Sequence, residues 1–419
     1  MINSLSGRIF IGLLLGFLTG TLIQYFLYNI NPELFDFILL KFKGFGSMFV
    51  NCIMLTVAPL VFFSITLGVL ELKDISSFKR LSLKTCILYL LNTVFAICCA
   101  AAVVYFFELG SGLDFKFEVT TNFLQQRNIP SFFDVITNIV PSNLVSAFSD
   151  SNMLQIIFLA ILLGVVINSL GEKAAPAFKF FSLGNDIMIR TILIVMKLAP
   201  FGVFFLMVNL GATFDLKMIA GVLQYIGLIF LLLFVWLVFV YPLAAYFFAG
   251  VTPLVFLRAI REQFLFSITT ASSSATIPLT MKALTDKLKV DRTIAGFGVP
   301  LGATVNMGGV SIYITVSIIF LINVFGIEIN SSNLPVLLFN VFFLAVGSGG
   351  VPGGGLVMIA VLVQQLGLPP EAFALIAAVD RIIDMAVTSV NVVGDTAVVL
   401  IVDRNEKKNS LKSASIASS

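Results

Sequence analysis

Histidine is absent from this chain of 419 residues, and tryptophan occurs only once. The lack of imidazole excludes histidine metal ligands and histidine proton relays. Charged residues make up 11% of the chain, whereas soluble domains carry roughly 25%. The net charge of +3 gives no indication of a nucleic-acid partner. The four cysteines all lie in apolar stretches, which favours core positions over a disulfide framework.

Hydrophobic residues dominate what is present, at 59% of the chain with a mean hydropathy of +1.06. We interpret the chain as a polytopic membrane protein and predict an all-α fold. Eight apolar runs are long enough to cross a bilayer. They lie at 9–29, 45–70, 82–107, 152–170, 186–211, 218–249, 294–325 and 371–402.

Two further apolar regions are interrupted by residues that disfavour a continuous helix. Region 253–287 contains Ser272-Ser273-Ser274, and region 333–368 contains a glycine-rich stretch at 347–355. Irregular backbone at membrane depth persists only where it is buried in protein or lines a cavity. We therefore predict two re-entrant helical hairpins whose tips lie inside the protein.

The distribution of lysine and arginine predicts the topology. Segments 73–84, 258–292 and 404–412 are rich in these residues and should face the cytoplasm, as should both termini. Segments 326–335 and 366–372 lack them and should face outside. The two hairpins then enter from opposite sides of an inner (plasma) membrane, which is the arrangement of an inverted repeat.

Polar residues follow one face of the last apolar run. They are spaced four, four, three and four residues apart, and they are Asp380, Asp384, Thr388, Asn391 and Asp395. At this spacing they fall within roughly an 80° arc of a helix. A carboxylate at the centre of a bilayer costs about 2.5–3.5 kcal/mol on insertion scales. The stripe therefore predicts a facing cation, cationic substrate group or water, the alternative being a structural polar network.

Three other clusters offer groups that can meet this stripe. The tip of the first hairpin, Ser272-Ser273-Ser274 (the serine tip), can donate hydrogen bonds from hydroxyls and amides to a carboxylate. Serine also favours ordinary turns. The tip of the second hairpin at 347–355 (the glycine tip) can expose backbone carbonyls that would bind a cation, or it can form an ordinary flexible loop. Asn306-Met307-Gly308-Gly309 predicts local unwinding that frees oxygens for a hard cation such as Na⁺, although glycine pairs also serve helix packing.

These clusters, in this order, resemble the dicarboxylate/amino acid:cation symporter family, which contains glutamate and neutral amino acid transporters. The resemblance runs from the first span to Asp395. It rests on the serine tip, the asparagine-methionine motif, the GVPGGG tip at 350–355, and D-x₃-D-x₆-N-x₃-D in the last span. It implies eight membrane helices, two hairpins, a homotrimer, elevator-type alternating access and no enzymatic activity.

The resemblance also implies a division of the chain. Residues 1–70 would form scaffold helices, 82–109 would form a transport-domain helix, and 110–150 would form an extracellular loop. Residues 151–250 would form two more scaffold helices and a transport-domain helix. Residues 251–404 would form the transport core, and 405–419 would form a cytoplasmic tail.

Residue roles follow by position from the same resemblance. Asp384 would bind the substrate ammonium, and Asn391 with the Ser273 region would bind the α-carboxylate. The implied substrate set is Ser272, Ser273, Ser274, Val310, Val351, Gly355, Asp384, Val387, Thr388 and Asn391. The implied cation ligands are Gly302, Thr304, Asn306, Met307, Ser348, Gly349, Val351, Asn391 and Asp395, and a third cation site matches Tyr89, Asn92 and Thr93. Asp380 and Arg381 adjoin these sets on the last span.

Departures from the family pattern affect the expected substrate. Acidic-substrate members carry an arginine one residue before the threonine of the last span, where this chain has Val387. The family's asparagine-methionine-aspartate-glycine-threonine is here 306–310, with Gly308 and Val310 in place of the aspartate and threonine. An unpaired buried substrate carboxylate would cost several kcal/mol. We therefore expect a neutral amino acid as the substrate. The missing aspartate at 308 argues against a third cation site. We expect Na⁺ as the coupling ion, with H⁺ as the alternative.

Other functions stay open at this point. An acidic amino acid or C4-dicarboxylate carrier would need Arg381 to replace the missing arginine, yet Arg381 lies about 100° around the helix from Asp380. A channel can also use re-entrant hairpins and carboxylates. An intramembrane aspartyl protease needs two aspartates on neighbouring helices, whereas the stripe lies on one. The expected partners are an amino acid, the lipid bilayer and further copies of this chain.

Overall fold

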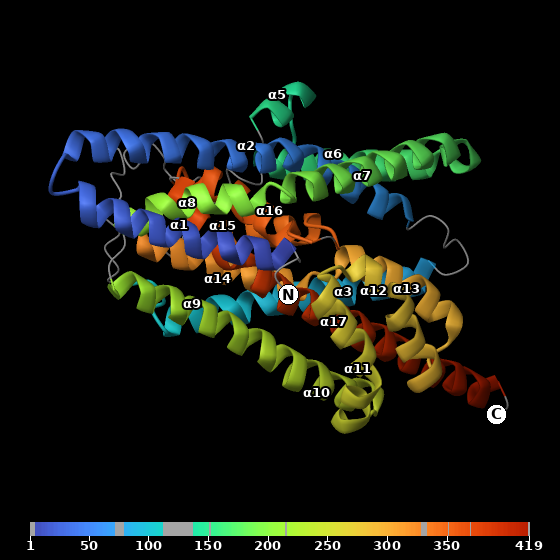
Figure 1. The fold of residues 1–419 in the computed structure, drawn as a ribbon. Coiled ribbons are helices and arrows are strands. Elements are labelled where there is room, and N and C mark those ends of the chain that lie inside the picture. Colours follow the sequence, from blue (N-terminus) through green and yellow to red (C-terminus); the bar gives the residue numbers. More distant parts are fainter. Residues whose placement is uncertain are drawn as a thin grey trace.

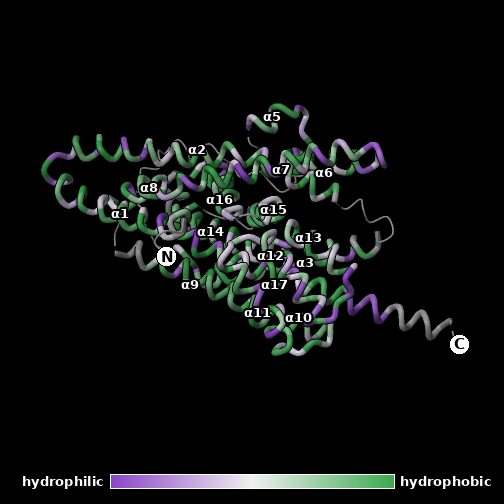
Figure 2. Tube along the Cα trace, turned by 45° about the vertical axis from the view of Figure 1, so that its right-hand side comes forward, coloured by the Kyte–Doolittle hydropathy of each residue, from purple (hydrophilic) through white to green (hydrophobic). Residues whose placement is uncertain are grey.

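The computed structural model describes residues 5–71, 79–111, 137–150, 152–213, 216–327, 333–350, 352–368 and 370–417. Within these ranges every regular element is a helix (Figure 1). The prediction of an all-helical fold is confirmed for these residues. Apolar residues cover most of each long helix, and a hydrophilic stretch lies toward the C-terminal end (Figure 2).

One group of helices comes from the N-terminal half of the chain. It consists of α1 (Leu5–Leu27), α2 (Pro32–Glu71), α6 (Met153–Ser169), α7 (Ala175–Met196) and α8 (Ala199–Thr213). Helices α1 and α8 pack closely because glycines face the partner backbone. A side chain at Gly12 or Gly16 would clash with the carbonyl oxygens of Pro200 or Phe204. A short helix, α5 (Leu144–Ser149), lies at the edge of this group.

A second group surrounds the buried helix α14 (Gly308–Val324), of which every residue except Asn323 is buried. Such a helix, buried on all sides, belongs in the interior of a large structure. Its neighbours are α3 (Lys79–Phe106), α9 (Leu216–Val235), α15 (Leu334–Gly347), α16 (Gly354–Gln365) and α17 (Pro370–Ala417). The π-helical turn Trp236–Val240 joins α9 to α10 (Tyr241–Ala249).

Both predicted interruptions are breaks between helices. The first separates α11 (Pro253–Thr270) from α12 (Ser273–Lys282), and the second separates α15 from α16. The two arms of the first pair are linked away from the tip, because Glu262 in the middle of α11 forms ion pairs with Lys282 and Lys287. Lys287 ends the π-helical turn Ala283–Lys287, which precedes α13 (Arg292–Val305).

The predicted number of eight spans is not confirmed. All eight apolar runs are largely helical, with breaks inside 186–211 and 294–325. Among the described residues, six helices are long and apolar enough to cross a membrane. A seventh span is obtained if the segments before and after Leu198, which are bent by 51°, count together. The run 152–170 forms α6, whose 17 residues fall short of the usual length. The predicted tail is helical as far as Ala417, and 112–136 of the predicted loop lie outside the described residues.

Candidate substrate and cation site

Three helix breaks bring non-helical backbone to the middle of the second group. They lie at Ala271–Ser272, Asn306–Met307 and Ser348–Gly353. Ala271 has a left-handed backbone with φ of +48°, and Gly349 and Gly353 have φ of +67° and +80°. Left-handed residues end helices and free backbone groups for other partners. The sequence motifs therefore mark real interruptions of the helical backbone.

The two hairpin tips touch each other. The hydroxyl of Ser272 and the amide of Ser274 both donate to the carbonyl of Gly350, at 3.2 and 3.4 Å. A side chain at Gly350 would clash with the carbonyl oxygen of Ala303, so only glycine fits between the first tip and α13. The tips are thus closed on one another in this structure.

The stripe predicted on the last span is buried. Asp380, Asp384, Thr388, Asn391 and Asp395 of α17 are each exposed by no more than 5%. Buried carboxylates require hydrogen-bond donors or cations nearby, and each of these three has a different donor. The stripe is therefore built into the interior of the protein.

Asp380 and Asp384 lie at the first half of the stripe. The hydroxyl of Tyr313 donates to Oδ1 of Asp380 at 2.8 Å. The amide of Gly353, in the second hairpin tip, donates to Oδ2 of Asp384 at 3.0 Å. Nη1 of Arg381 lies 3.5 Å from the same oxygen, so this arginine pairs with Asp384 instead of extending away from the stripe.

Asn391, Asn306 and Asp395 form the second half of the stripe. Nδ2 of Asn306 donates to Oδ1 of Asp395 at 2.8 Å and to the carbonyl of Asn391 at 3.2 Å. Oδ1 of Asn391 accepts from the amide of Gly309 at 2.8 Å. The backbone of Gly302 is close by, because a Cβ placed there would lie 2.5 Å from Asp395 Oδ1. One carboxylate among amide and carbonyl oxygens is a donor set that suits a hard cation.

Helix α3 reaches the same region. Nδ2 of Asn92 donates to Oδ1 of Asn306 at 2.9 Å and lies 3.3 Å from the hydroxyl of Tyr241. The hydroxyl of Tyr89 donates to the carbonyl of Gly298 at 2.9 Å. Thr93, in contrast, donates to the carbonyl of Tyr89 in its own helix.

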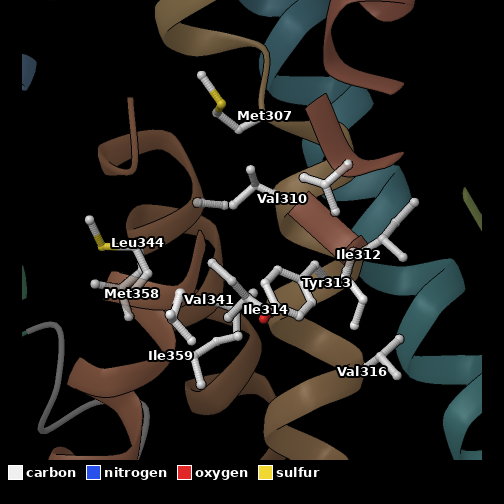
Figure 3. Close-up of a cluster of buried hydrophobic side chains, with 14 of the residues drawn as sticks. Met307, Val310, Ile312, Tyr313, Ile314, Val316, Val341, Leu344, Met358 and Ile359 are labelled. Atoms are coloured by element: carbon white, nitrogen blue, oxygen red, sulfur yellow. The ribbon is translucent and has the colours of Figure 1, made fainter. Parts of the chain in front are cut away.

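The apolar positions of the expected pocket are also buried. Val387 and Val310 are exposed by 1% and 5%. A Cβ placed on Gly355 of the second hairpin would lie 3.7 Å from Cγ1 of Val310 and 2.9 Å from the ring of Tyr313. Val310 and Tyr313 lie among apolar side chains of α15 and α16, including Met358 (Figure 3).

The side chains of the remaining predicted ligands form hydrogen bonds within their own helices or lie beside the stripe. The hydroxyls of Ser348 and Thr304 donate to carbonyls of their own helices, those of Ala345 and Leu301. Met307 is buried, and its sulfur lies 3.6 Å from Nδ2 of Asn391. Val351 lies outside the described residues. Within the described ranges no group of three or more acidic or cysteine side chains converges on one point, so a multi-carboxylate metal centre is absent there.

Tyr241 and Tyr313 are members of the network that sequence reasoning missed. Both contact stripe residues or their partners through their hydroxyls. A tyrosine in an apolar run is a weak signal, because its ring alone explains its presence. Tyr313 lies four residues after Gly309, a helical spacing that places both on one side of α14.

Comparisons with known proteins identify the family of the chain. The model of the sodium:dicarboxylate symporter family matches residues 5–405. A proton/sodium-glutamate symport protein of Bacillus subtilis is 27% identical over 408 residues, 96% of this chain and 92% of that protein. A proton/glutamate-aspartate symporter of Escherichia coli is 27% identical, covering 98% and 95% of the two chains. A C4-dicarboxylate transport protein of Bacillus subtilis is 26% identical, covering 88% of each. The chain therefore belongs to the sodium:dicarboxylate symporter family of cation-coupled membrane transporters and is not an enzyme.

Proposed function

We propose that this symporter carries a neutral amino acid, coupled to Na⁺. The observation that carries the proposal is the combination of a polar stripe suited to an amino acid backbone with a valine, Val387, at the position next to Thr388. A pocket that recognises the backbone and surrounds the side chain with apolar groups selects an uncharged substrate.

The backbone of the substrate would lie between the hairpin tips and α17. Asp384 would receive the ammonium group in place of the Gly353 amide, which donates to it now. The α-carboxylate would lie near Asn391 and near Ser272, Ser273 and Ser274, which lie at the N-terminus of α12. A helix N-terminus with free amides favours a carboxylate.

The side chain of the substrate would face Val310, Gly355, Val387 and Thr388. Among these groups only the Thr388 hydroxyl is polar, and none carries a positive charge. Acidic side chains would be buried there without a partner, which costs several kcal/mol. The named relatives transport glutamate, aspartate or C4-dicarboxylates, so this substrate class would be a departure from them.

The coupling cation would bind Asp395 with oxygens of Asn306, Asn391 and Gly302. Backbone oxygens of Thr304, Met307, Ser348 and Gly349 would form a second position beneath the outer hairpin. Two of the relatives named above are described as proton/sodium or proton symporters. Proton coupling is therefore the alternative that the experiment has to separate.

We also propose the family's assembly, a homotrimer with an elevator movement, in the plasma membrane with both termini in the cytoplasm. The domain division proposed from the sequence is supported by two groups of helices. Helices α1, α2, α6, α7 and α8 pack mainly with one another, and the hairpins, α13, α14 and α17 form the other group. The mass of the detergent-solubilised complex, measured by light scattering, tests the trimer.

The test of substrate and ion is uptake into proteoliposomes. All twenty amino acids and succinate would be presented with Na⁺ and pH gradients imposed separately. We expect saturable, Na⁺-driven uptake and counterflow of a neutral amino acid, lost in Asp384→Asn. Uptake restricted to acidic substrates would contradict the neutral pocket, and flux without counterflow would indicate a channel.

A second candidate is an acidic amino acid or C4-dicarboxylate symporter. It is favoured by the position of Arg381, which lies 3.5 Å from Asp384 at the candidate site. In that case Arg381→Gln would abolish uptake of the acidic substrate. For a neutral substrate the same change would leave the order of preference among substrates unaltered.

A further inference from the structure

The side chain of Asn92, on α3, ends among polar groups of α10 and of the break before α14. Its Nδ2 atom lies 2.9 Å from Oδ1 of Asn306 and 3.3 Å from the hydroxyl of Tyr241. Two oxygens from separate elements thus converge on one nitrogen. Such convergence is what oxygen ligands show around a small cation.

The orientation of these amides follows from the carbonyl of Asn391. A backbone carbonyl only accepts hydrogen bonds, so Asn306 must turn its Nδ2 toward the carbonyl of Asn391, at 3.2 Å, and the same Nδ2 lies 2.8 Å from Oδ1 of Asp395. Oδ1 of Asn306 then faces α3 and needs a donor. Asn92 supplies that donor with its NH₂ group, and the oxygen of Asn306 is satisfied by the protein itself.

The space for Asn92 exists because position 308 carries no side chain. A Cβ placed on Gly308 would lie 2.7 Å from Nδ2 of Asn92 and 3.0 Å from the hydroxyl of Tyr241. Gly394 behaves similarly, because its Cβ would lie 2.6 Å from the Tyr241 hydroxyl and 2.7 Å from Nδ2 of Asn306. Asn92 and Gly308 therefore fit each other, and a side chain at 308 would clash with the amide.

We propose that the Asn92 amide takes the place of a cation at this position, so that no cation binds between α3 and Asn306. The proposal rests on the cation coupling proposed above and limits the number of cations that accompany each substrate. Asp395 is the one carboxylate in this network, and it is available to a single cation near Asn391. A cation beside Asn92 would instead meet the amide hydrogens of that residue, which already occupy the oxygens of Asn306 and Tyr241.

A double substitution, Asn92→Ser with Gly308→Asp, should convert this position into a cation-binding site. Serine removes the amide and leaves an oxygen, and aspartate supplies a carboxylate in the vacated space. An acidic residue is compatible with position 308, because this residue begins α14 and helix N-termini favour negative charge. The experiment measures radioactive Na⁺ bound per protomer of purified protein, together with the steepness of Na⁺ dependence of uptake.

We expect the double variant to bind an additional Na⁺ and to show steeper Na⁺ dependence than the wild type. Asn92→Ala should bind as many Na⁺ as the wild type, because it removes a donor and no ligand. Gly308→Asp alone should gain none, because Asn92 still fills the space. Cys98→Ser, an exposed position on α3, is the matched control.

Loss of a bound Na⁺ in Asn92→Ala would overturn the proposal, because it would make Asn92 a ligand. A folded double variant with an unchanged Na⁺ count would overturn it too. If the double variant does not fold, Asn92→Ala decides the question. Bound Na⁺ is counted without transport, so failure of cation-driven uptake in the wild type would count against the proposed function alone.

Discussion

At the scale of single residues, every carboxylate of the buried stripe has a donor from a different part of the chain. Asp380 is paired with Tyr313, Asp384 with Gly353 and Arg381, and Asp395 with Asn306. Removing one partner of a buried charged pair is more harmful than lacking the pair altogether, because a desolvated charge remains. Substitutions of the side-chain donors should therefore lower stability as much as substitutions of the aspartates.

Removal of the Tyr313 hydroxyl tests this directly. Tyr313→Phe keeps the ring that packs near Gly355 but leaves Asp380 without its 2.8 Å donor. We expect the unfolding free energy to fall by about 1–3 kcal/mol, the cost of an unsatisfied buried group, measured as a lower melting temperature in detergent. Tyr246→Phe, at an exposed position, is the control and should not differ from the wild type.

Introduction of a positive charge at Val387 tests the substrate pocket. Val387→Arg should raise the ratio of acidic to neutral amino acid uptake by ~10-fold or more, equivalent to about 1.4 kcal/mol of differential binding. Competition between labelled glutamate and the best neutral substrate measures the ratio. Val387→Leu adds volume without charge and should leave the ratio unchanged. If arginine brings no gain at all, the assignment of Val387 to the side-chain pocket is wrong.

At the scale of elements, the interruptions of helices could be predicted, but their partners could not. Serine and glycine tracts and the Asn306 motif located the breaks because local backbone preferences decide them. The shared carbonyl of Gly350, 78 residues from Ser272, depends on tertiary packing that no local pattern encodes. The contact between Tyr241 and Asn92, which are 149 residues apart, also depends on tertiary packing. So does the orientation of the Arg381 side chain toward Asp384.

The start of α13 provides a prediction about pH. Asp291 caps this helix, and the amide of Thr293, which donates to its carboxylate at 2.8 Å, lowers the pKa of that group. Because the folded pKa lies below the usual value, the charge stabilises the protein above that usual value. The contribution is lost as the pH falls through the lowered folded pKa.

Asp291→Ala should therefore lower stability at neutral pH by about 0.5–2 kcal/mol, as for other helix caps, and by less at acid pH. Melting temperatures measured from neutral to acid pH provide the check. Asp291→Asn keeps a capping oxygen and removes the titration, so its deficit should be small and independent of pH. A constant deficit for alanine over the whole range would contradict this role of the charge.

At the scale of the whole molecule, the second hairpin, formed by α15 and α16, is one of the places where the two helix groups meet. A Cβ placed on Gly347, at the end of α15, would lie 3.4 Å from Val61 Cγ1 and Ile65 Cδ1 of α2. An elevator movement would carry the hairpin along α2 and break this contact in every cycle. A rigid molecule would keep it throughout.

A cross-link between these groups separates the two possibilities. In a background with Cys52, Cys86, Cys98 and Cys99 replaced by alanine, we introduce Val61→Cys with Gly347→Cys. A Cβ placed on Gly347 would lie 3.4 and 3.8 Å from the two γ-carbons of Val61, and a cysteine sulfur occupies a γ position, so the pair is close enough to test for a disulfide. Oxidation should stop uptake, and reduction should restore it. Either single cysteine serves as control, and full uptake by an oxidised, cross-linked protein would exclude relative movement at this contact.

The pairing of α1 with α8 has a consequence for biogenesis. Thr21 of α1 bonds to the carbonyl of Gly211, 190 residues later in the chain. At a synthesis rate of about 5–20 residues per second, α8 follows α1 out of the ribosome by roughly 10–40 s. During that time the glycine face of α1 meets lipid or the insertion machinery. Nascent chains that end before α8 should consequently be recognised by membrane quality control, while chains extended past it should escape.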